Sequence, residues 1–177
     1  MDETLRIIAV WVHILGIALF VGPQFFLAFA WPPASRLITD ARVRVRVMRT
    51  ITRRFGYLGG VGLVLIIVAG TYLISTWRDY YGIPDDTRFT EIRYGVVFIV
   101  KMTLLIVLLA VTAAHAFIVG PKLSDLLEAQ AEGERFQDDA VRSMRLRSMA
   151  LSITGLVTAL AMMVMGTMLA TPAFSLQ

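Results

Sequence analysis

Long apolar runs alternate with short polar segments along this chain, and four of the runs are long enough to cross a bilayer. They cover residues 7–31, 55–77, 94–121 and 148–171. A membrane-spanning helix needs about 20 apolar residues. Because the hydrocarbon core offers no partner to an exposed backbone amide, each run is predicted to be a helix. The sequence therefore predicts an all-α, integral membrane four-helix bundle that forms one domain over residues 1–177.

Basic residues are unevenly distributed over the connections, and this predicts an orientation. The connection between the first two runs holds seven arginines against one acid, Asp40. The second connection mixes arginines with acids, and the third, over residues 122–147, again carries several basic residues. Since basic loops stay on the cytoplasmic side, we expect an N-out/C-out protein of a bacterial-type inner (plasma) membrane. A turn is expected near Gly133.

Four arginines of the first connection share one helix face, which predicts that the second helix continues beyond the membrane on the basic side. They are Arg42, Arg46, Arg49 and Arg53. One interpretation is that they fix the topology close to lipid headgroups. The other is a platform for an anionic ligand. Both alternatives remain open from the sequence.

Composition narrows the class of protein further. Hydrophobic residues make up 57% of the chain and charged residues only 17%, whereas a soluble domain is about a quarter charged. The absence of cysteine excludes disulfides, thiolate metal sites and iron–sulfur clusters. The net charge of +4 follows from the topology, so no nucleic-acid partner is expected. Asp2 and Glu3 precede the first run, which is therefore expected to be a retained helix rather than a signal peptide.

Polar residues inside the runs are the candidates for function, because an ionisable group in a membrane helix is costly and faces the protein interior. Helical spacing puts Tyr94, Lys101, Thr112 and His115 on one face of the third helix, and His13, Gly16, Phe20 and Gln24 on one face of the first. The second helix has a small-residue face at Gly59, Gly62 and Gly70, suited to close packing.

The depth of each polar residue follows from the rise per residue, and it predicts two layers. His13 and Lys101 are level in the outer half, where Met162 and Met165 of the fourth helix also lie. His115, Gln24 and Thr154 form an inner layer. The alternatives are that Lys101 snorkels to the headgroups, that each histidine is a packing residue, and that the methionines fill space.

Several short motifs, in this order and spacing, resemble the CopD-like copper-resistance membrane domain. Residues 94–101, "YGVVFIVK", resemble its Tyr-Gly-x5-Lys signature, and residues 13–22, "HILGIALFVG", resemble its first helix. "RRF" before the second run and "GPKL" after the third also fit. The resemblance implies a four-helix membrane domain that binds a copper ion or passes it across the membrane.

A related four-helix pattern, the HemJ-type protoporphyrinogen oxidase, also has a histidine in its first helix and a lysine in its third. This chain departs from that family in two places. "RLRSMALS" stands where the family has Asn-Glu-x-Pro, and the histidine that follows the third-helix lysine is displaced to His115.

Three functions are compatible with these residues. The first is copper binding or transport, for which the candidate ligands are His13, Met162, Met165 and His115, since imidazole and thioether suit copper. The second is a membrane redox protein that binds haem b through histidine with methionine or lysine. The third is a non-catalytic structural subunit that forms a homo-oligomer or joins a partner membrane subunit. Signatures of nucleotide-binding proteins, proteases and hydrolases are absent, and no catalytic residue is expected.

Overall fold

Every regular element is helical in the part of the chain that the structure describes, residues 2–132 and 138–177. In this computed structural model, four helical segments are long and apolar enough to cross a membrane: Glu3–Arg36, Ala41–Ser75, Arg93–Glu132 and Asp139–Leu169. This confirms the predicted all-α architecture of four long apolar helices. The expected turn near Gly133 lies outside the described residues.

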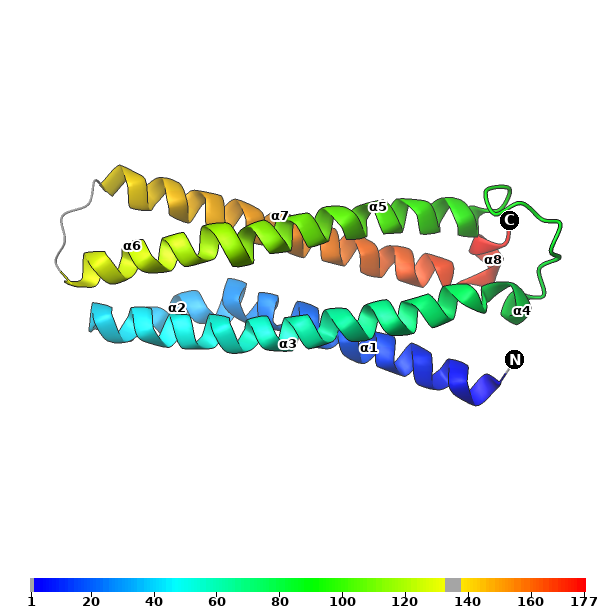
Figure 1. Cartoon of the computed structure of the whole chain (residues 1–177), viewed down its shortest axis with the longest axis horizontal. Coiled ribbons are helices and arrows are strands. Elements are labelled where there is room, and N and C mark those ends of the chain that lie inside the picture. Colours follow the sequence, from blue (N-terminus) through cyan, green and yellow to red (C-terminus); the bar gives the residue numbers. More distant parts are fainter. Residues whose placement is uncertain (1, 133–137) are drawn as a thin grey trace.

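The four segments are built from α-helices and two short π-helical turns. In chain order the elements are α1 (Glu3–Phe25), η1 (Phe26–Ala30), α2 (Trp31–Arg36), α3 (Ala41–Ser75), α4 (Trp77–Tyr81), α5 (Arg93–Ala114), η2 (His115–Val119), α6 (Gly120–Glu132), α7 (Asp138–Leu169) and α8 (Pro172–Ser175). They pack mainly as two antiparallel hairpins, α1 against α3 and α5 against α7 (Figure 1). Both chain termini lie at the same end of the bundle, called here the terminal end, and the opposite end is called the arginine end.

The first hairpin is held by a backbone-to-backbone approach of two glycines. A Cβ atom on Gly16 would lie 2.7 Å from the Gly62 carbonyl oxygen, and a Cβ on Gly62 would lie 2.6 Å from the Gly16 carbonyl oxygen. Gly59 faces the Phe20 ring and Gly70 faces the His13 imidazole. The small-residue face predicted for the second helix is therefore the surface on which α1 packs, as expected where lipid gives helices no hydrophobic reason to associate.

Both π-helical turns immediately precede proline. The backbone N–H of Trp31 donates to the Phe26 carbonyl, just before Pro32, and the N–H of Gly120 donates to the His115 carbonyl, just before Pro121. A proline ring in an α-helix clashes with the carbonyl four residues earlier. Widening the preceding turn by one residue relieves that clash and lets α1 and α5 continue into α2 and α6.

At the terminal end, aromatic rings join the two hairpins. Trp77 stacks on Tyr94 with ring centroids 4.7 Å apart, and Leu169 of α7 completes the cluster. The Tyr81 hydroxyl donates to the Leu169 carbonyl at 3.2 Å. Burial, opposed by the nearby Arg6, raises the pKa of Tyr81 above its ordinary value, so the phenol stays protonated as a donor.

At the arginine end, α3 is longer than a bilayer crossing requires, and the arginine-bearing segment before the second apolar run is helical, as predicted. With 35 residues it is about 52 Å long, against a hydrocarbon core of about 30 Å. Asp40 caps its first turn by accepting from the backbone N–H of Arg42 at 2.8 Å. Arg49 pairs with Glu128 of α6 at 2.7 Å, so the extension is tied to the second hairpin.

The glycine contact predicts which substitution disrupts the bundle. We expect Gly62→Ala to lower the free energy of unfolding by about 1–3 kcal/mol, because its methyl group would overlap the α1 backbone. Gly60→Ala is the matched control, since nothing lies within 4 Å of a Cβ at that position; it should be neutral or stabilising. Thermal unfolding of both purified variants in detergent measures the difference. Equal melting temperatures would show that the close approach is not what holds α1 to α3.

Candidate functional site

His13 is held in a defined orientation between α1 and α3. Its Nδ1 atom lies 3.1 Å from the Ile66 carbonyl oxygen, and the ring packs against Gly70. Because a carbonyl only accepts, Nδ1 must carry the hydrogen, and in the neutral ring Nε2 is then left with a lone pair. Metal-binding histidines are oriented in this way, by a hydrogen bond from the second ring nitrogen to a carbonyl. The geometry therefore makes His13 a packing residue and a candidate ligand at the same time.

The structure places His13 and Lys101 at the same depth. The stacked rings of Trp77 and Tyr94 provide a common level near the terminal end. Gly70 precedes Trp77 by seven residues, and Lys101 follows Tyr94 by seven residues. Each therefore lies about 10 Å from that level, and His13 packs on Gly70.

Lys101 ends against α7. Its Nζ atom lies 3.6 Å from the position of a Cβ on Gly166, a residue about 5 Å from the level of Leu169. The side chain thus leans toward the terminal end, as snorkelling predicts, but it does so along the α5–α7 interface and stays half-buried. Within residues 2–132 and 138–177, no hydrogen bond or ion pair engages its ammonium group.

The methionines are placed differently from one another. Met162 packs against a buried cluster formed by Phe20, Val21, Leu108 and Ala159, which is the space-filling role. Met165 is half-buried and directly precedes Gly166, the residue that the Lys101 ammonium faces. Among the described residues, no three His, Cys, Asp or Glu side chains come together as a metal site. Any metal at this level would therefore depend on the His13 imidazole with thioether sulfur.

The predicted inner layer is not assembled as a network. His115 opens the η2 turn, about 21 Å further along α5 than Lys101, and its buried Nδ1 has no hydrogen-bond partner among the described residues. Gln24 donates to the Phe20 carbonyl of its own helix at 3.3 Å. Thr154 is exposed, whereas Gln24 and His115 are half-buried. His13 and His115 are too far apart to bind one ion together.

The remaining two candidates have separate roles. Tyr94 is buried in the aromatic cluster of the terminal end, where it stacks on Trp77. Thr112 is half-buried on α5, one turn before His115. Neither residue contributes to the region around His13. The residues of the face predicted on the third helix therefore lie in several separate surroundings and do not line one continuous path.

Two contributors to the site escaped the sequence reasoning because they act through backbone. The Ile66 carbonyl orients His13, and the absence of a side chain at Gly166 leaves room for the Lys101 ammonium beside the α7 backbone. Nothing in an isoleucine predicts a role for its carbonyl. Gly166 could have been recognised from the sequence, since a glycine inside a membrane helix indicates close approach of another group.

Comparisons with protein-family models, with curated proteins and with solved structures give no match to this chain.

The hydrogen bond to Ile66 predicts the tautomer of His13. In the ¹⁵N spectrum of histidine-labelled His115→Ala protein, at mildly alkaline pH, we expect Nδ1 to carry the proton and Nε2 to be unprotonated. His115→Ala leaves His13 as the one histidine in the chain, so its signals need no further assignment. A spectrum with the proton on Nε2 would contradict the orientation and remove Nε2 as a ligand.

Proposed function

We propose that the chain is an inner-membrane protein of the bacterial type with both termini outside. Both termini lie at the end of the bundle opposite the arginine-rich extension of α3 (Figure 1). The positive-inside tendency then assigns the arginine end to the cytoplasm.

We further propose that the protein binds copper as Cu(I) within the outer half of the membrane. The observation that carries this proposal is the 3.1 Å contact of His13 Nδ1 with the Ile66 carbonyl, which leaves Nε2 for a ligand. Met165, half-buried and directly before Gly166 on α7, is the candidate thioether. Imidazole and thioether together suit Cu(I). The resemblance of residues 13–22 and 94–101 to the CopD-like domain supports the same ion as cargo.

The residues fit copper in donor type but not in charge. A cation bound at His13 would be repelled by the Lys101 ammonium, which lies at the same depth of the bundle. No carboxylate among the described residues offsets this charge at the same level.

That charge favours a second candidate, haem b. His13 would be an axial ligand, and Lys101 would bind a carboxylate of the haem. The pattern of a first-helix histidine with a third-helix lysine, shared with HemJ-type proteins, supports this alternative. A structural subunit without a ligand is the third candidate, and it is the outcome if neither ligand is found.

Metal analysis and an absorption spectrum of one purified sample separate these functions. Copper without a Soret band is expected for the wild type, and a Soret band would select haem. His13→Ala should remove either ligand, whereas His115→Ala should retain it, because it lies at a different depth. Lys101→Met should retain or raise copper occupancy by removing a repelling charge, but it should lower haem occupancy by removing a carboxylate partner. Absence of both ligands from folded wild-type protein would leave the structural role.

Single-cysteine labelling tests the orientation, since the chain has no cysteine of its own. In intact cells, an impermeant maleimide should label Asp86→Cys and spare Ala41→Cys, because the two exposed positions lie at opposite ends of the bundle. Both should react after the cells are opened. Labelling of Ala41→Cys in intact cells would reverse the proposed topology.

A further inference from the structure

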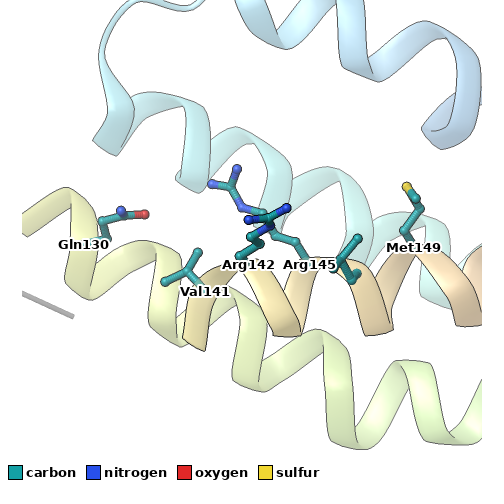
Figure 2. A pocket seen from close by; sticks show the side chains of 6 residues that line it. Gln130, Val141, Arg142, Arg145 and Met149 are labelled. Carbon is teal, nitrogen blue, oxygen red and sulfur yellow. The ribbon is translucent and has the colours of Figure 1, made fainter. Parts of the chain in front are cut away.

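Two adjoining cavities lie at the arginine end, far from the His13 region. The first has a volume of about 370 Å³ and is lined by Gln130, Val141, Arg142, Arg145, Leu146 and Met149 (Figure 2). The second, of about 600 Å³, lies between α2, α3, α6 and α7 and includes Arg44 in its wall. Gln130 and Arg145 belong to both. The two cavities therefore adjoin at these two residues, and together they are called the pocket here; each is large enough for a small polar group.

The pocket has an excess of positive charge. Figure 2 shows the Arg142 and Arg145 side chains leaving α7 toward the same space. Among the described residues, the one hydrogen bond of the Arg44 side chain is to the backbone carbonyl of Ile38, at 3.5 Å. Glu128, on the adjacent face of α6, is already paired with Arg49. Arg44, Arg142 and Arg145 are all exposed, and an anion between them would lower the repulsion between their guanidinium groups.

The remainder of the wall is apolar. Val141 is only 5% exposed, and Trp31, Met48, Leu127 and Met149 contribute further hydrophobic surface. Such a pocket matches an anionic head with an apolar portion better than a fully hydrated ion, because each part of that ligand meets a wall of its own kind.

The pocket is also held in shape by contacts that do not use its arginines. Arg42 Nε donates to the Ala131 carbonyl at 3.2 Å, and Arg49 pairs with Glu128 at 2.7 Å. Both contacts connect α3 to α6. A wall fixed before binding loses little conformational freedom when a ligand enters.

We propose that this pocket, at the arginine end of the bundle, binds a phosphate-bearing anion through Arg44, Arg142 and Arg145. The planar guanidinium matches phosphate oxygens in pairs, and several guanidiniums together meet the multiple charge of a phosphate. The phosphate could belong to an anionic phospholipid at the membrane face or to a soluble molecule. The pocket lies about 39 Å along α3 from Gly70, measured from Arg44, so the proposal is independent of copper or haem at His13.

The lipid source is tested in nanodiscs that contain phosphatidylglycerol and phosphatidylcholine. Native mass spectrometry counts the lipids retained by the protein on release. We expect the wild type to retain phosphatidylglycerol selectively, and Arg145→Gln to lower that retention about tenfold, the loss typical of a charge-assisted hydrogen bond. Arg44→Gln, on a different helix, should have the same effect. Arg147→Gln is the matched control, because this exposed arginine of α7 lines neither cavity.

The soluble source is tested in a neutral detergent with inorganic phosphate and pyrophosphate as probes. Stabilisation of the wild type and of Arg147→Gln, but not of Arg145→Gln, with no preference for phosphatidylglycerol in the first experiment, would assign the pocket to a soluble phosphate. The proposal is overturned if the three variants lose lipid equally and neither probe raises the melting temperature of the wild type. The arginines would then act only as determinants of topology.

Discussion

The close approach of α1 and α3 at Gly16 and Gly62 is the contact on which the candidate site depends. Inside lipid, apolar surface gains nothing by leaving the bilayer for another helix, so association relies on packing that only small residues allow. Here each glycine faces the carbonyl oxygen of the other. Because the two backbones approach so closely, the Ile66 carbonyl, one turn along α3, comes within reach of His13. A larger residue at Gly62 would therefore alter the orientation of the imidazole as well as the stability of the hairpin.

The two hairpins are joined mainly at their ends and by one small core. At the terminal end, Trp77 stacks on Tyr94 and the Tyr81 hydroxyl binds the α7 backbone. At the arginine end, α3 is linked to α6 by an ion pair and a hydrogen bond. Between them, Phe20 and Val21 of α1 meet Leu108 of α5 and Ala159 of α7. The level of His13 and Lys101 lies between the aromatic cluster and this core. At this level the Lys101 ammonium has no hydrogen-bond or ion-pair partner among the described residues.

The sequence predicted the elements well and the contacts unevenly. Apolar run length gave all four helices, and glycine spacing gave the face of α3 that packs on α1. The π-helical turns were not predicted, because they arise from a local balance between a proline ring and the carbonyl before it. Such a turn adds a residue to the helix and rotates everything that follows, which is one reason why facing residues beyond His115 cannot be assigned from a regular period. The exposure of Thr154 was not predicted, because a threonine hydroxyl bonds its own helix backbone as readily as a neighbour and so gives little indication of the side chain's direction.

The His13 lone pair and the Lys101 positive charge favour different ligands, and this difference distinguishes copper from haem as the candidate. His13 offers a lone pair at Nε2, and Lys101 offers a positive charge and hydrogen-bond donors at the same depth. A bare cation satisfies the histidine and is repelled by the lysine. An anion alone satisfies the lysine and leaves the lone pair unused. A ligand that joins an electrophilic metal to a carboxylate satisfies both groups, as does a copper ion that arrives with an anionic ligand of its own. The charge balance at Lys101, more than the preference of imidazole for any one metal, therefore decides which function this level of the bundle supports.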